Sequence, residues 1–311
     1  NYRPLANVLD EKSIVNGIVG LLATGGSTNH TIHLVAIAAA AGITIDWQDF
    51  SDLSSVVPQL AHVYPNGSAD VNHFHAAGGL GFIIRDMLDN GLLHEDVTTI
   101  LGDGLRRFCQ EPHIDGGALE WRDGPREPLD TDIRRPCSDP FNAEGGLRLV
   151  TGNLGRAIVK VSAVDPQRHA IKAPARVFSS QKAFVDAFNN EELEQDFVAV
   201  VTQEGPRANG MPELHKLTPY LGLLQNRGYK VALLTDGRMS GASGKVLAAI
   251  HVTPEAVDGG AIAKIRDGDM ITIDANRGVI AVIDDGDFEQ RAAEVKAPAR
   301  VQDPVGLVAE V

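Results

Sequence analysis

The chain has 311 residues, of which 43% are hydrophobic and 22% are charged, as is usual for folded soluble proteins. The 28 basic and 41 acidic residues give a net charge of −13, which disfavours binding to nucleic acid or to an anionic membrane surface. Two cysteines without a C-x-x-C spacing predict a reducing, cytoplasmic compartment, and no apolar run is long enough for a membrane span.

The first part of the chain alternates helical patterns with glycine-rich turns. A helix is predicted at 29–41, with Asn29 as its N-cap and Gly42 as its stop. Next come a short strand, a helix that breaks near Pro58, a helical segment and a linker that crosses the surface, predicted at 43–46, 49–61, 70–90 and 121–146.

Short β-branched runs dominate the second part of the chain. They predict strands at 147–151, 157–164, 175–178, 198–202, 230–235, 270–274 and 279–283. Helices are predicted at 181–189, 212–224 and 287–295. Many strands with few helices indicate a barrel or another closed β-rich domain with helices on its outside.

The most informative segment is 230–246, KVALLTDGRMSGASGKV. An apolar strand runs into a turn with glycines at 237, 241 and 244, and a helix-like stretch is predicted at 245–250. Consecutive N–H groups at such a strand-to-helix turn would bind an anion. The Walker spacing of a phosphate loop is missing, because it requires Gly at Met239 and Ser or Thr at Val246. A purely structural turn is the other alternative.

Residues 232–243, ALLTDGRMSGAS, resemble the C-terminal signature of the dihydroxy-acid and 6-phosphogluconate dehydratases. Four further segments are similar to motifs of this family and follow in the same order. They are GGSTN at 25–29, GNL at 152–154, EGP at 204–206 with GMPE at 210–213, and HVTPEA at 251–256. The matches extend over most of the chain, which is identified on them as a member of this family.

The resemblance implies an α/β portion, residues 1–142, followed by a β-rich barrel of the swivelling type, residues 143–311, with the active site between them. It implies a lyase, and VNHFHAAGG at 71–79 together with 104–122 favours the phosphogluconate branch. That branch dehydrates 6-phospho-D-gluconate to 2-dehydro-3-deoxy-6-phosphogluconate in the Entner–Doudoroff pathway. The alternative within the family is a 2,3-dihydroxy acid of branched-chain amino-acid synthesis or another sugar acid.

Site residues follow from the resemblance in the same way. Ser240 matches the proposed general base and Glu204 a divalent-metal ligand, with Mg²⁺ as the suggested ion. Ala242 stands where some members have Thr, so the role of that hydroxyl does not carry over. The surrounding loop implies substrate contacts from Thr235, Asp236, Gly237, Arg238 and Gly241.

The family also implies an iron–sulfur cluster, of the 4Fe-4S type, and a homodimer. Nothing in the chain matches the Cys-Asp-Lys motif of the family, so the cluster ligands are expected upstream of Asn1. Cys109 and Cys137 are interpreted as non-ligands, because two thiolates do not complete a Cys₄ set. The chain is thus expected to supply the base and to be incomplete without the upstream part.

Several polar residues have two interpretations. His30 with His33, and His73 with His75, have spacings compatible with a metal site, but such pairs are common without metal. His73, His75 and the arginine pairs 106–107 and 134–135 are candidates for the substrate phosphate or for solvated surface. Ser27, Thr28 and Asn29 are explained by helix capping at least as well as by ligand binding.

Two hypotheses from other classes remain. One is a sugar-acid-binding module without catalysis of its own. The other is a nucleotide-dependent transferase that uses the turn at 237–245 for phosphates, against which the missing Walker spacing counts.

Overall fold

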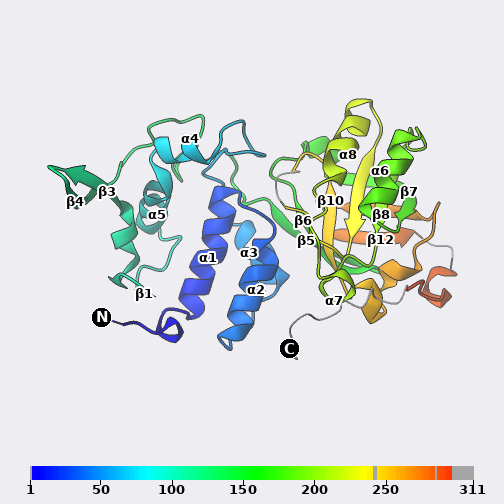
Figure 1. Ribbon diagram of the computed structural model, residues 1–311, viewed down its shortest axis with the longest axis horizontal. Coiled ribbons are helices and arrows are strands. Elements are labelled where there is room, and N and C mark those ends of the chain that lie inside the picture. The colour runs from blue at the N-terminus through cyan, green and yellow to red at the C-terminus, as the bar shows by residue number, and fades with distance from the viewer. Residues whose placement is uncertain (1, 241–243, 284–285, 296–311) are drawn as a thin grey trace.

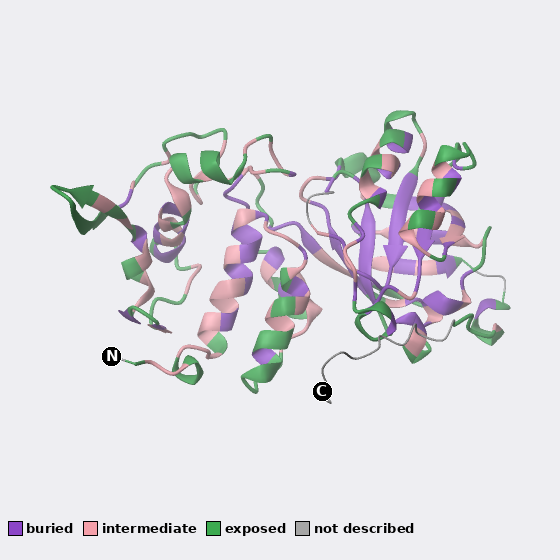
Figure 2. Ribbon diagram, in the orientation of Figure 1, coloured by how far each residue is buried: buried purple, intermediate pink, exposed green. Residues whose placement is uncertain are grey.

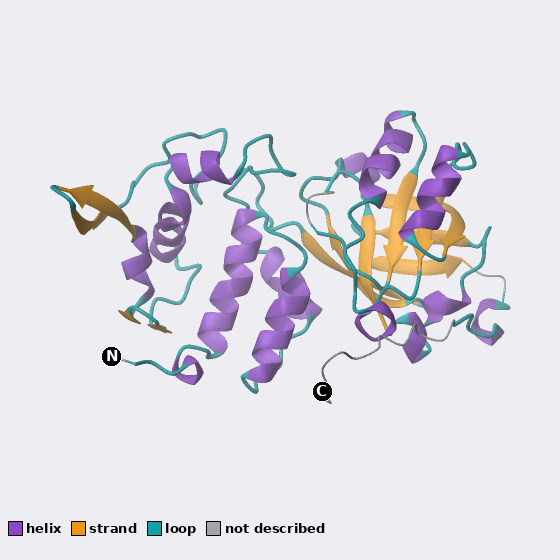
Figure 3. Cartoon of the chain, viewed as in Figure 1, coloured by secondary structure: helices purple, strands orange, loops and turns teal. Residues whose placement is uncertain are grey.

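The computed structural model describes residues 2–240, 244–283 and 286–295, and it places a helical part beside a β-barrel (Figure 1). Figure 3 shows the helices of the first part on one side and the strands of the barrel on the other. The α-helices are α1 (Glu11–Thr24), α2 (His30–Ala40), α3 (Trp47–Ser54), α4 (Val71–Ala76), α5 (Gly79–Asp89), α6 (Gln181–Asn189), α7 (Pro206–Asn209) and α8 (Leu217–Asn226).

Two small hairpins belong to the helical part, and one of them projects from its far end (Figure 1). The strands of these hairpins are β1 (Thr98–Thr99), β2 (Gly102–Asp103), β3 (Gln110–Asp115) and β4 (Ala118–Asp123). The barrel strands are β5 (Leu147–Gly152), β6 (Gly155–Lys160), β7 (Ala170–Phe178), β8 (Phe197–Val201), β9 (Val231–Thr235), β10 (Ala248–Thr253), β11 (Met270–Asp274) and β12 (Val279–Ile283).

The barrel is closed and mixed, with the strand order β10-β6-β5-β12-β11-β7-β8-β9. Strands β7 to β10 run parallel to one another, and the remaining pairs are antiparallel apart from β12 with β5. Val198 and Val200 of β8 point into the barrel core, whereas Phe197, Ala199 and Val201 pack beneath α6 and α8. The strand is therefore buried on both faces (Figure 2), which explains its unbroken apolar run. The predicted α/β portion followed by a β-rich barrel with peripheral helices is confirmed.

The helical part shares a hydrophobic core with the start of the barrel. Leu147 of β5 and Ile158 of β6 belong to the same buried cluster as Ile18 and Leu22 of α1. The hydroxyl of Ser54 at the end of α3 accepts a hydrogen bond from the backbone N–H of Leu147, at 3.0 Å. This shared core fixes the end of α1 against β6, and the candidate site lies at that junction.

Several element predictions were wrong in detail. Residues 43–46 form no strand, because the carboxylate of Asp46 caps α3 by accepting from the N–H of Gln48. Helix α3 ends at Ser54, before Pro58. The predicted helix at 287–295 is reduced to a single 3-10 turn, Phe288–Gln290, among the described residues.

The predicted linker at 121–146 is not confined to the surface. It starts within the exposed strand β4, and farther along it contains Arg134, which is fully buried. The Arg134 guanidinium donates to the carbonyls of Ala77, after α4, and of Gly79, at the start of α5, and it lies 4.5 Å from the centre of the Phe82 ring. Burial lowers the pKa of Arg134 to about 10. This arginine joins the linker to the helices and is neither solvated surface nor open to a phosphate.

Replacing Arg134 with Met should therefore destabilise the protein. A buried carbonyl left without a hydrogen-bond partner costs about 1–3 kcal/mol of stability. Part of this loss is offset because the variant no longer pays for desolvating the guanidinium. We expect the free energy of unfolding to fall by roughly 2 kcal/mol, measured by denaturant unfolding. The exposed Arg126→Met is the matched control and should stay within about 0.5 kcal/mol. Equal stability of the two variants would contradict this role.

Candidate active site

The loop after β9 is held by its own first residues. The hydroxyl of Thr235 accepts from the N–H of Gly237 at 2.9 Å. The carboxylate of Asp236 is buried and accepts from three backbone N–H groups, those of Gln203, Glu204 and Ala256, each at 3.0 Å. Asp236 thus ties three segments of the barrel rim together, and its predicted contact with substrate stays a prediction.

Glu213 holds the second part of this loop. Its carboxylate accepts the backbone N–H of Ser240 and, at 3.2 Å, the side-chain amide of Asn29. Arg238 lies 3.5 Å from the same carboxylate, and its Nε donates to the carbonyl of Met211 at 2.6 Å. The GMPE segment therefore fixes the backbone on which Ser240 stands.

The segment that precedes α2 docks onto this loop from the helical part. The hydroxyl of Thr28 is buried and donates to the carbonyl of Met239 at 2.6 Å. Asn29 is the N-cap residue of α2, but its side chain makes no capping hydrogen bond and donates to Glu213 instead. The hydroxyl of Ser27 accepts from the N–H of Asn29, at 3.3 Å. Capping alone therefore does not explain this segment, which joins the two parts of the chain.

His251 strengthens the same junction. It is buried, with 1% of its surface exposed, and its Nδ1 lies 3.2 Å from the hydroxyl of Thr31. That hydroxyl already donates to the carbonyl of Thr28, so we assign the proton to Nδ1 of His251. Its Nε2 has no hydrogen-bond partner among the described residues, and burial lowers the pKa of the ring to about 3. The histidine is therefore neutral at physiological pH.

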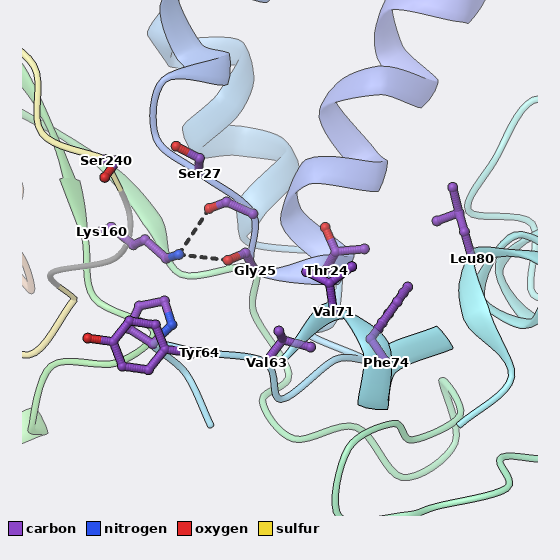
Figure 4. A pocket seen from close by; sticks show the side chains of 12 residues that line it. Thr24, Gly25, Ser27, Val63, Tyr64, Val71, Phe74, Leu80, Lys160 and Ser240 are labelled. Atoms are coloured by element: carbon purple, nitrogen blue, oxygen red, sulfur yellow. Dashed lines mark hydrogen bonds between the residues drawn. The ribbon is translucent and has the colours of Figure 1, made fainter. Parts of the chain in front are cut away.

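A cavity of about 450 Å³ lies between the two parts of the chain (Figure 4). The end of α1 and the turn after it form one wall, the barrel contributes Lys160 and Ser240, and apolar side chains form much of the rest. The described residues that line it are Thr24, Gly25, Gly26, Ser27, Val63, Tyr64, Pro65, Val71, Phe74, Leu80, Lys160 and Ser240.

Lys160 is the charged side chain among these lining residues. Its Nζ donates to the carbonyls of Gly25 and Gly26, at 2.7 and 3.0 Å (Figure 4). Burial lowers its pKa from 10.5 to about 8. Sequence analysis missed this residue, since a lysine that ends an apolar strand is usually solvated.

Glu204 does not line this cavity. It is buried, accepts from the side-chain amide of Asn209 at 2.8 Å, and lines a separate cavity of about 760 Å³. Burial and, after it, the charge of Asp236 raise the pKa of Glu204. Among the described residues no group of three or more His, Cys, Asp or Glu side chains is arranged to hold a metal ion.

The other predicted candidates lie apart from the cavity. His30, His33, His73 and His75 are exposed, and His73 pairs with Asp70 at the start of α4. Arg106 pairs with Asp89 and Glu95, Arg107 donates to the carbonyl of Leu101, and Arg135 stacks on Phe141. Gly241 falls outside the described residues.

The two cysteines are poor metal ligands in this structure. Burial raises the pKa of the Cys109 thiol, and burial together with Asp86 raises that of Cys137 to about 12. Because the thiolate is the ligand form, both environments disfavour iron binding. The residues described here therefore do not fit an iron–sulfur cluster.

The comparison with protein families agrees with the motifs. Residues 1–108 match the family model of the dihydroxy-acid/6-phosphogluconate dehydratase N-terminal region, and residues 132–310 match the C-terminal one. The chain belongs to the dihydroxy-acid/6-phosphogluconate dehydratase family. Sequence analysis had identified this family from its motifs, and the identification is confirmed.

Individual relatives within the dehydratase family separate its branches. The chain is 61% identical to the phosphogluconate dehydratase of Pseudomonas aeruginosa over 94% of its own length and 48% of that protein. It is 53% identical to that of Escherichia coli over 100% of its length and 51% of that protein. The dihydroxy-acid dehydratase of Sulfurisphaera tokodaii is 38% identical over 94% of this chain and 50% of that protein. The chain spans about half the length of these relatives.

The buried Lys160 gives stability a measurable pH dependence. Unfolded lysine holds its proton up to about pH 10.5, whereas the folded group releases it near pH 8. The free energy of unfolding should therefore rise with pH between these values, by roughly 3 kcal/mol at most. Below pH 8 the folded protein bears the full cost of burying the charged lysine.

We expect denaturant unfolding between pH 7 and 10.5 to show this rise in the wild type and to lack it in Lys160→Met. The exposed Lys172→Met serves as the control and should follow the wild type. The same pH profile in all three proteins would contradict the burial of a charged Lys160.

Proposed function

We propose that this chain forms the base-bearing part of a hydro-lyase that converts 6-phospho-D-gluconate to 2-dehydro-3-deoxy-6-phosphogluconate. The observation that carries the proposal is the place of Ser240, in a cavity that the GGSTN segment and the signature loop build together. Identities of 53–61% to proteins named phosphogluconate dehydratase, against 38% to a dihydroxy-acid dehydratase, support the phosphorylated substrate.

In this proposal Ser240 removes the proton from C2. The electron pair of the C2–H bond moves towards the carboxylate, and the C3–O bond then breaks to release hydroxide. The proton and the hydroxide leave as water, and the enol product tautomerises to the 2-keto acid. A serine oxygen is basic enough only as an alkoxide, which needs positive charge or N–H donors nearby.

The contacts of the described segment that ends at Ser240 support such a role. The N–H of Ser240 donates to Glu213, the carbonyl of Met239 accepts from Thr28, and Asp236 anchors the start of the loop. A base positioned this way loses little freedom when the substrate binds. We further propose that Thr235, Gly237, Arg238 and Gly241 contact the substrate.

The cofactors are proposals as well. We propose that a 4Fe-4S cluster is held by residues outside this chain, since the cysteines described here do not fit it. When bound, such a cluster supplies a Lewis acid for the departing hydroxide. None of the steps assigned above to residues of this chain involves the cluster.

The predicted Mg²⁺ ligand Glu204 needs a direct test. Asn209 donates to its carboxylate, and the neighbouring Asp236 is already engaged by backbone N–H groups, so the described surroundings of Glu204 do not complete a metal site. Mg²⁺ titration of the full-length Glu204→Gln and Glu213→Gln variants separates two carboxylates. A tenfold or greater loss of affinity in Glu204→Gln alone would support the assignment. A loss in Glu213→Gln alone would move the ligand to the carboxylate beside Ser240.

Organisation and setting complete the proposal. We propose a division into an α/β portion at 1–142 and a barrel domain at 143–311, in a cytoplasmic homodimer that binds neither nucleic acid nor membrane. The net charge of −13 supports the proposed lack of binding to nucleic acid and membrane. No helix in the described part of the chain is long and apolar enough to cross a bilayer.

The rival hypotheses differ in their support. The turn at 237–245 leads into strand β10 and not into the expected helix, so the helix-terminus phosphate site of a nucleotide-dependent transferase is missing. The hypothesis of a sugar-acid-binding module without catalysis has still to be tested. It predicts that the full-length protein binds 6-phosphogluconate and leaves it unchanged.

Ser240→Ala should lower kcat by about 10²–10⁴-fold in the full-length protein prepared without oxygen. The measurement is formation of 2-keto-3-deoxy-6-phosphogluconate, and the cluster absorbance should persist in the variant. Ser138→Ala, at an exposed serine, is the control and should keep full activity. Undiminished turnover by Ser240→Ala would remove Ser240 from the mechanism.

A further inference from the structure

Lys160 carries a buried charge without a counterion among the described residues. It ends strand β6, and its side chain is 8% exposed. No described carboxylate lies within 4 Å of its Nζ. The two hydrogen bonds of the ammonium go to the neutral carbonyls of Gly25 and Gly26. An ammonium has three N–H donors, so with respect to the residues that the structure describes, one donor and the positive charge remain for a ligand.

Anchoring the turn after α1 does not by itself require a lysine. A neutral amide or hydroxyl could donate to the same carbonyls without the cost of burying a charge. Burial lowers the pKa of Lys160 to about 8, yet at that value the ammonium still predominates at neutral pH. A buried cation that faces a cavity is best explained by an anion that enters the cavity.

The place of Lys160 relative to Ser240 indicates which anion this is. A second, small cavity of about 20 Å³ shares two lining residues with the first, Lys160 and Ser240. Both side chains therefore line the same part of the larger cavity, whose other walls include Val63, Val71 and Phe74 (Figure 4).

We propose that Lys160 binds the carboxylate of the sugar acid and stabilises the charge that spreads onto it when Ser240 removes the C2 proton. This role rests on the proposed function. The carboxylate is bonded directly to C2, whereas the phosphate is four carbons farther along the chain. A cation beside the base thus meets the carboxylate. Charge that develops in a dry site is stabilised most by a cation already in position.

The test compares two ligands that differ at one end. 6-Phosphogluconate carries both the carboxylate and the phosphate, and sorbitol 6-phosphate has a CH₂OH group in place of the carboxylate. Binding is measured by calorimetry with the full-length protein in the Ser240→Ala background, in which turnover is expected to be slow. Lys160→Gln keeps amide donors for Gly25 and Gly26 and removes the charge.

We expect Lys160→Gln to weaken 6-phosphogluconate binding by about 10–100-fold, the usual value of a charge-assisted hydrogen bond. Binding of sorbitol 6-phosphate should change less than about threefold, which is the size of a minor packing effect. Lys160→Met, which keeps most of the length and has no donors, should show the same selective loss. Thermal unfolding checks that both variants are folded.

Each other outcome counts against the inference. Equal weakening of both ligands would limit Lys160 to anchoring the Gly25–Gly26 turn, and unchanged affinity for both would exclude a ligand contact. These results leave the proposed function in place, since the parent protein still binds 6-phosphogluconate. Failure of the parent to bind either ligand would overturn the proposed substrate, and this role with it.

Discussion

The turn at Gly25 and Gly26 joins the helical part to the barrel through the side chain of Lys160. Gly25 has a φ of 58°, and a side chain there would lie 2.4 Å from the amide of Asn66. Only glycine therefore allows the carbonyls of both residues to face Lys160 on β6. With the turn fixed, Thr28 reaches the carbonyl of Met239 next to Ser240. The positions of the cavity wall, of Lys160 and of Ser240 thus all depend on the close approach of the Gly25–Gly26 backbone to strand β6.

Buried ionisable groups are concentrated around this junction, and they are satisfied in different ways. Asp236 is surrounded by backbone N–H groups, which stabilise its charge and make it a structural anchor. His251 avoids charge altogether, since it is neutral and hydrogen-bonded at one nitrogen. Lys160 is the exception, because its hydrogen bonds reach neutral carbonyls and no described residue balances its charge. This difference separates Lys160, for which we propose a ligand, from residues that stabilise the fold.

Sequence analysis succeeded where local pattern decides the structure. Strands β11 and β12 and helix α6 were predicted with their observed bounds, because alternation, turn residues and the Ser180 cap are all local signals. It failed at 245–250, where an apolar run after glycines suits a helix as well as a strand. There the parallel pairing with β9 decides for strand β10, and no local window contains that partner.

The same limit applies to the candidate site. Ser240 was predicted as the base from the family resemblance of residues 232–243, a dense motif of glycines and polar residues, and the roles of its motif neighbours were predicted with it. Glu213 and Lys160 acquire their importance only from partners far along the chain, at Asn29 and at Gly25 and Gly26. A lysine at a strand end is indistinguishable from a solvated one until the segment that covers it is placed. Residues that act across a junction between two parts of a chain are therefore the ones a single sequence conceals, and here they surround the predicted base.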